Sequence, residues 1–98
     1  MGDYDWVVIT WSRASPRRHA CPCCGLRTIV DDHVPPGTYS TCPVCGWEDD
    51  LVQCRDPDYR GGANDDSLNQ VRTAFEIWRD AGMPPDDRRR PPLPAELP

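Results

Sequence analysis

The sequence predicts a small α+β domain in which short β-hairpins are followed by a single α-helix. Two observations support this prediction. The pattern Cys-Pro-x-Cys-Gly occurs twice, at residues 21–25 and 42–46, and apolar side chains recur at helical spacing within residues 67–81. A chain of 98 residues is close to the size below which burial alone rarely stabilises a fold. We therefore expect a metal ion or disulfides to supplement the core.

Residues 1–15 are expected to be an N-terminal extension of this domain. Segment 4–11 is rich in β-branched and aromatic residues, which predicts an extra strand. The first residues include acids where an export signal needs positive charge, and the apolar run 6–11 is too short for a signal core or a membrane span. We therefore expect a cytoplasmic protein whose cysteines are reduced thiols.

The two Cys-Pro-x-Cys-Gly motifs are typical of a metal site. Two residues between the cysteines allow a tight turn that aims both thiolates at one point, and the final glycine accepts a positive φ. A hairpin that pairs residues 26–30 with 37–41 would bring the two turns together, with its tip at 31–36. The sequence thus predicts a zinc ribbon with two knuckles. One structural zinc ion is expected to be held by Cys21, Cys24, Cys42 and Cys45.

Thiol–disulfide exchange is the competing chemistry for a Cys-x-x-Cys pair. It normally places the first cysteine at a helix N-terminus within a βαβ unit, and neither motif is followed by helical periodicity. Zinc with four cysteine ligands keeps no open position for a substrate, so a catalytic zinc is also disfavoured. Cys23 and Cys54 remain outside this site. They could be packed residues, oxidation-sensitive thiols or a disulfide pair, or could join His19 and His33 in a second metal site, which no regular spacing supports.

The α-helix is expected at about residues 67–81. Ser67 or the preceding aspartate can cap its N-terminus, and Gly82 offers a C-terminal stop. One face of this helix is apolar, with Trp47 as the expected bulky partner; its residues are Leu68, Val71, Phe75 and Trp78. The folded domain should span 16–83, and the tail 84–98, rich in proline and arginine, is expected to be disordered.

An acidic, turn-rich segment lies between the second motif and the helix. Its carboxylates could bind Mg²⁺ or Ca²⁺ or act in acid–base catalysis, but the favoured role is to cap turns and accept hydrogen bonds from the backbone. If the segment also binds a partner, the candidate contact residues are Trp47, Glu48, Asp49, Asp50, Tyr59 and Asn64.

These motifs resemble those of the bacterial cysteine-rich CPCC proteins, which are small, zinc-ribbon-like chains. The resemblance covers residues 20–82. The segments that support it are Cys-Pro-Cys-Cys-Gly at 21–25, Cys-Pro-Val-Cys-Gly-Trp-Glu-Asp-Asp at 42–50, Asp-Pro at 56–57, Gly-Gly-Ala-Asn at 61–64 and Ser-Leu at 67–68. The resemblance implies a zinc ribbon and no particular activity, because the family looks functionally uncharacterised.

Three classes of function fit these features. The favoured one is a zinc-stabilised protein-interaction module, similar by analogy to immunity proteins, that presents the acidic loop to a partner; the net charge of −5 predicts that this partner is basic. The first alternative is a small metal-assisted hydrolase that uses residues 47–50, 56–58 and 61–64, although no nucleophile–base pair is recognisable. The second alternative is a nucleic-acid-binding ribbon, which the negative charge disfavours. The sequence thus favours a role that is not enzymatic and predicts no membrane partner.

Overall fold

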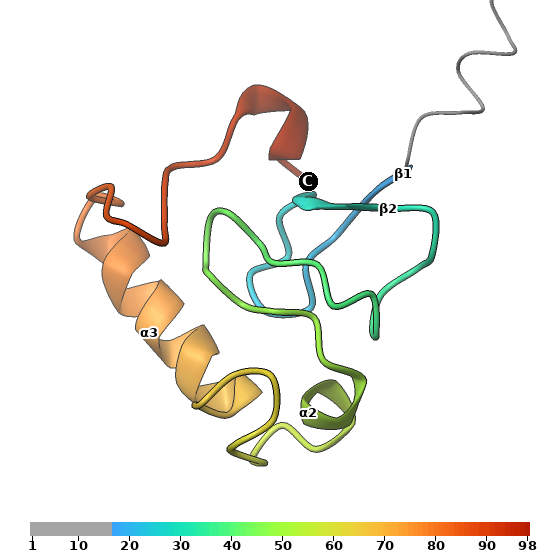
Figure 1. Cartoon of the computed structure of the whole chain (residues 1–98). Coiled ribbons are helices and arrows are strands. Elements are labelled where there is room, and N and C mark those ends of the chain that lie inside the picture. The colour runs from blue at the N-terminus through green and yellow to red at the C-terminus, as the bar shows by residue number, and fades with distance from the viewer. Residues whose placement is uncertain (1–16) are drawn as a thin grey trace, which may run out of the picture.

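The computed structural model describes residues 17–98 of the chain (Figure 1). In this part, five elements follow one another: β1 (Arg17–His19), β2 (Ile29–Asp31), α2 (Leu51–Arg55), α3 (Leu68–Asp80) and the 3-10 turn η1 (Pro94–Glu96). The arrangement is a small α+β fold, as the sequence predicts, with one α-helix more than expected. The strand predicted at residues 4–11 lies outside the described residues.

The two strands form an antiparallel pair around the first cysteine motif. Arg18 of β1 is opposite Val30 of β2. The sequence analysis predicted instead that residues 26–30 would pair with 37–41, and this pairing does not form. Thr41 is bridged to Glu48, across the second motif. Each motif therefore lies at the closed end of its own chain reversal.

Helix α2 is a single short element that the sequence analysis did not predict. The side chain of Asp50 caps its N-terminus and accepts hydrogen bonds from the N–H groups of Val52 and Gln53. Five residues are too few to show a helical period in the sequence. The only available signal is the aspartate in the N-cap position.

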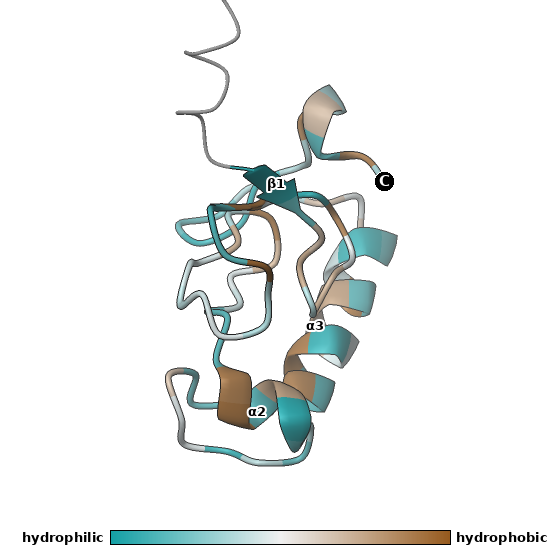
Figure 2. Cartoon of the chain, turned by 90° about the vertical axis from the view of Figure 1, so that its right-hand side faces the viewer, coloured by the Kyte–Doolittle hydropathy of each residue, from teal (hydrophilic) through white to brown (hydrophobic). Residues whose placement is uncertain are grey.

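Helix α3 confirms the helix predicted at about residues 67–81. Ser67 caps it in a reciprocal arrangement: its hydroxyl accepts from the Gln70 N–H, and the Gln70 side chain accepts from the Ser67 N–H. Leu68 and Trp78 are buried on one face, and Figure 2 shows hydrophobic and hydrophilic stretches alternating along the helix. Neither α2 nor α3 has the length and apolar character that crossing a membrane requires.

The hydrophobic core joins the two cysteine turns to α3. Its buried members are Cys21, Ile29, Cys42, Val44, Cys45, Trp47, Leu68, Phe75 and Trp78. Trp47 is fully buried in the same cluster as the helix residues, as the sequence analysis expected. The rings of Phe75 and Trp78 lie 6.1 Å apart, centroid to centroid. Three of the four converging cysteines are thus part of the core, and the fourth, Cys24, packs against it.

The segment 84–98 differs from the disordered tail that the sequence predicts. Figure 1 shows it running from the end of α3 back to the strands. The Pro84 carbonyl accepts from the Trp78 indole N–H at 2.8 Å, and the Arg90 N–H donates to the Pro43 carbonyl at 3.2 Å. Backbone hydrogen bonds and a buried acid, Glu96, hold the segment in place. Low hydrophobicity is the usual sign of disorder, so composition alone conceals these contacts.

Candidate metal centre

Four cysteine side chains converge between the two turns, and all their sulfur atoms lie within 4.8 Å of one another: Cys21, Cys24, Cys42 and Cys45. The Cys21 and Cys45 sulfurs are 3.7 Å apart, and the Cys24 and Cys42 sulfurs are 3.8 Å apart. A regular tetrahedron of sulfurs around an ion, with metal–sulfur bonds of about 2.3 Å, has edges of about 3.8 Å. The donor set and its spacing therefore fit one tetrahedral metal ion.

The two turns have the same backbone geometry. In each, the N–H of the glycine donates to the carbonyl of the first cysteine: Gly25 to Cys21 at 2.8 Å, and Gly46 to Cys42 at 2.9 Å. The φ angles of the two glycines are 79° and 82°, in the region that only glycine adopts without strain. The repeated motif thus folds into the same turn twice, and each copy directs two sulfurs inward.

The Cys42 sulfur has the richest set of donors. The Thr28 hydroxyl donates to it at 2.9 Å, and the N–H groups of Val44 and Cys45 lie 3.4 Å from it. The neighbouring sulfurs, that of Cys21 first, and the Thr28 hydroxyl lower the pKa of Cys42. These donors stabilise a thiolate, which is the form that ligates a metal. The sequence analysis did not single out Thr28, because no motif marks a buried hydroxyl beside a sulfur.

Packing four thiols together also opposes ionisation at two of them. The neighbouring sulfurs, with Cys21 first, raise the pKa of Cys24 and of Cys45. Several thiolates cannot share a buried site unless a cation balances their charge. The electrostatics of the cluster therefore favour a bound cation.

The other two cysteines lie outside this cluster. All six cysteines are free, and Cys23 and Cys54 are half-buried side chains packed against the core. Burial is the main factor that raises the pKa of the Cys54 thiol. His19 and His33 both lie beside Asp31: the His19 ring nitrogen is 3.0 Å from its carbonyl, and the His33 ring nitrogen is 3.2 Å from its carboxylate. The structure therefore does not bring these four residues together as a second site.

The acidic segment after the second turn is part of the fold. Asp49 accepts from the Thr38 N–H at 2.9 Å and from the Thr38 hydroxyl at 2.7 Å. Asp50 caps α2 and also accepts from the Ala63 N–H at 2.9 Å. This Ala63 bond, followed by those from the start of α2, lowers the pKa of Asp50. The capping role that the sequence analysis favoured is what both carboxylates perform.

The predicted partner-contact residues do not form one exposed surface. Trp47, Asp49 and Asp50 are buried, and Glu48 is half-buried. Asn64 holds the backbone of Glu48: its amide oxygen accepts from the Glu48 N–H at 2.9 Å, and its amide nitrogen donates to the Glu48 carbonyl at 2.8 Å. The prediction that these residues are presented to a partner is therefore corrected, because Trp47, Asp49 and Asp50 are buried within the fold. Among the six, only Tyr59 is exposed.

Gln53 of α2 organises the loop that follows, and the sequence analysis missed it. It is fully buried, and its side chain makes hydrogen bonds with the carbonyls of Tyr59, Asn64 and Asp66 and with the backbone and side-chain amides of Asn64. A Cβ on Gly62 would lie 2.8 Å from the Gln53 amide oxygen, so this close approach requires glycine. No sequence motif identifies a buried glutamine that makes hydrogen bonds to several residues of one loop.

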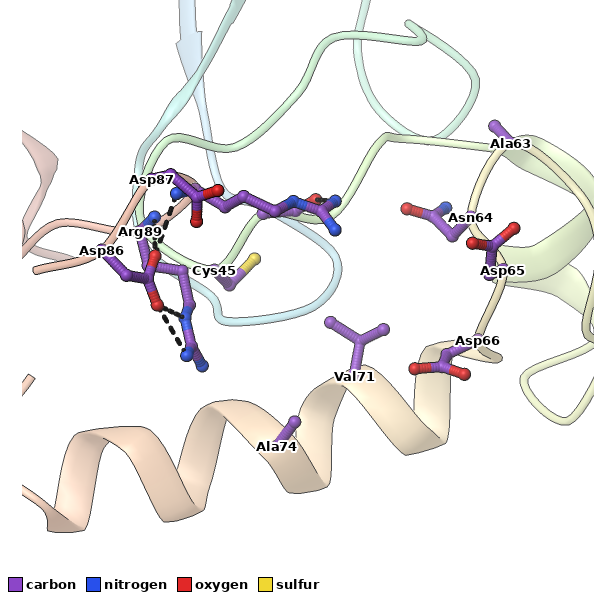
Figure 3. A pocket seen from close by; sticks show the side chains of 12 residues that line it. Cys45, Ala63, Asn64, Asp65, Asp66, Val71, Ala74, Asp86, Asp87 and Arg89 are labelled. Atoms are coloured by element: carbon purple, nitrogen blue, oxygen red, sulfur yellow. Dashed lines mark hydrogen bonds and ion pairs between the residues drawn. The ribbon is translucent and has the colours of Figure 1, made fainter.

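A cleft of about 470 Å³ borders the cysteine cluster (Figure 3). The Cys45 side chain points into it, and Val71 and Ala74 of α3 lie along one side. Residues 63–66 lie at one end, and 86–89 lie at the other. The lining provides carboxylates and guanidinium groups but neither a hydroxyl nucleophile nor an imidazole base. The groups that face the cleft are therefore mainly charged, with the Cys45 thiol among them.

Comparison with known proteins adds one positive finding. The sequence model of a protein family described as cysteine-rich CPCC matches residues 19–91, which is more than half of the chain. The matched range contains both cysteine turns and both α-helices. A comparison with curated proteins gave no match.

Proposed function

The chain belongs to the cysteine-rich CPCC family, and from this membership and the converging sulfurs we propose that it is a small, zinc-stabilised binding module. The ion would be held by Cys21, Cys24, Cys42 and Cys45. The observation that supports this most strongly is the sulfur spacing of 3.7 and 3.8 Å, which agrees with the edges of a tetrahedral zinc–thiolate site.

The role of the proposed ion is structural. Cys21, Cys42 and Cys45 are buried, and four protein ligands leave no position for a substrate. When bound, zinc supplies the positive charge that allows buried thiolates to coexist. The protein contributes the two identical turns and the Thr28 hydroxyl that fix where the sulfurs lie.

Metal content of purified variants tests this proposal. Wild-type protein is expected to carry one zinc per chain, and Cys42→Ser or Cys45→Ser should lose it, because three thiolates hold zinc much more weakly than four. Cys23→Ser and Cys54→Ser are the matched controls and should retain zinc. Elemental analysis with native mass spectrometry measures the ratio and also identifies iron, which accepts the same four-sulfur geometry. Loss of zinc in the Cys54 variant together with full zinc in the Cys42 variant would contradict the ligand assignment.

The proposed partner is a protein with a basic surface. The net charge of −5 supports this, because a negative field speeds the capture of cationic partners. Since Asp49 and Asp50 are buried, we assign the contact to the exposed residues of the next loop. The acidic and aromatic ones are Asp56, Asp58, Tyr59, Asp65 and Asp66, and the cation Arg60 is exposed beside them.

The role of the charge on this loop can be tested by comparing a variant that removes two of its carboxylates with one that removes two carboxylates from α3. Asp56→Asn/Asp65→Asn is expected to lower the association rate several-fold for a partner captured from the host cell, and to weaken its salt dependence. Glu76→Gln/Asp80→Asn, on the exposed side of α3, removes the same charge and should have a smaller effect. Binding kinetics measured against salt concentration decide the matter. If the two double variants lower the association rate equally, the loop is not part of the interface.

A further inference from the structure

The C-terminal segment 84–98 contacts both cysteine turns. On one side, the Arg90 N–H donates to the carbonyl of Pro43, which lies between the two ligand cysteines of the second turn. On the other side, the Glu96 carbonyl accepts from the N–H of Arg27, two residues after Gly25 closes the first turn, at 2.6 Å. One stretch of chain therefore connects the two halves of the metal centre from outside.

An ion pair holds this segment in a closed shape. The two terminal nitrogens of Arg90 each lie 2.8 Å from a different oxygen of Glu96. The Glu96 side chain is only 4% exposed, and it also accepts from the Leu93 N–H at 2.8 Å. Paired hydrogen bonds between a guanidinium and a carboxylate are among the stronger polar contacts in proteins; here the carboxylate is buried, while the Arg90 side chain is 37% exposed. The pair therefore fixes the distance between the Pro43 and Arg27 contacts.

The beginning of the same segment is anchored on α3. The Trp78 indole N–H donates to the Pro84 carbonyl at 2.8 Å, and the Arg89 guanidinium lies over the Trp78 ring, 5.0 Å from its centroid. A terminal nitrogen of Arg88 lies 3.5 Å from the carbonyl of Gly46. The segment is thus fixed to the helix at one end and to the two turns along its length.

The position of this segment also determines how the sulfurs can be reached. Residues 86–89 line one end of the cleft into which Cys45 points, as Figure 3 shows. Cys45 is 6% exposed. These residues narrow the cleft at this end, so displacement of the segment would widen the path to the Cys45 sulfur.

From these contacts we propose that residues 84–98 form a clasp that slows release of the metal ion, and that the Arg90–Glu96 ion pair controls how often the clasp opens. The inference rests on the proposed metal site. Release requires the two turns to separate or a sulfur to become accessible, and the clasp opposes both motions. Arg90 and Glu96 are positioning residues in this account, because neither supplies a ligand atom.

The test follows zinc transfer from the zinc-loaded full chain to a chromogenic chelator. Glu96→Gln keeps the size of the side chain and removes its charge, and it should release zinc roughly tenfold faster or more, the factor that corresponds to losing a charged hydrogen bond. Arg90→Lys keeps the charge but cannot make the paired contact, so its rate should lie between those of wild type and Glu96→Gln. Asp80→Asn, an exposed carboxylate of α3, is the matched control and should release zinc at the wild-type rate.

The number of zinc ions per chain and the rate of zinc release together distinguish the possible outcomes. One zinc per chain in every variant, with faster release only when the ion pair is altered, supports the clasp. A wild-type rate in both loaded Glu96→Gln and loaded Arg90→Lys would overturn it while leaving the metal site intact. Wild-type protein that takes up no zinc would instead defeat the proposed function. If Glu96→Gln does not fold, Arg90→Lys alone decides: a wild-type release rate overturns the clasp, and a faster rate supports it.

Discussion

Removal of the proposed zinc ion is expected to abolish the cooperative unfolding transition of this protein. In the described residues the strands are three residues each, and three ligand cysteines are among the buried members of the core. Zinc binding contributes on the order of 10 kcal/mol in comparable small sites. This is similar to the whole free energy of unfolding of an ordinary domain, roughly 5–15 kcal/mol. Thermal melts followed by circular dichroism, with and without a strong chelator, measure the effect.

The design of that experiment separates metal loss from other effects of the reagent. The same chelator saturated with zinc should leave the melt unchanged, and adding zinc to the stripped protein should restore it. A reducing agent is kept present so that the free thiols cannot form disulfides. A cooperative melt that persists at the same temperature after complete removal of zinc would show that the fold does not depend on the ion.

Gln53→Ala is expected to lower the free energy of unfolding by about 3 kcal/mol or more. The Gln53 amide lies among three carbonyl oxygens and two donors of Asn64, all within the loop that precedes α3. Each buried polar group left without a partner costs about 1–3 kcal/mol, and a cavity would form as well. Urea unfolding of the zinc-loaded protein measures the change.

Two further variants show whether the hydrogen bonds are responsible. Gln53→Glu keeps the shape but loses the amide donors, so it should be destabilising to a similar degree. Gln70→Ala removes the same atoms from the capping box of α3, where they make one bond, from the Ser67 N–H. Gln70→Ala should lower the free energy of unfolding by only about 1 kcal/mol. Equal costs for Gln53→Ala and Gln70→Ala would mean that Gln53 does not organise the loop.

The two cysteine turns and the existence of α3 can be predicted because their signals are local. In each motif, two cysteines separated by two residues are followed by a glycine with positive φ, so the residues that define the turn lie within one short segment. Likewise, Ser67 and Gln70 form the capping box within one turn of the helix. In both cases the determining residues lie within a few positions of each other.

The features that could not be predicted depend on distant pairs. In the proposed clasp, Arg90 contacts Pro43 and Glu96 contacts Arg27. Composition alone describes Arg90 and Glu96 as part of a polar, proline-rich tail. Asp49 looks like a surface acid in the sequence, but it is buried, and one of its carboxylate oxygens accepts from the N–H and the hydroxyl of Thr38. In each case the partner that satisfies the polar group is chosen by the folded chain, so no spacing rule reveals it.

In the proposed site, one zinc ion is bound by the sulfurs of Cys21, Cys24, Cys42 and Cys45. X-ray absorption at the zinc edge, on protein purified without added metal, tests it most directly. The account predicts four sulfur neighbours at about 2.3 Å and no nitrogen or oxygen neighbour. Zinc coordinated by nitrogen or oxygen, or a protein that contains no zinc, would contradict it.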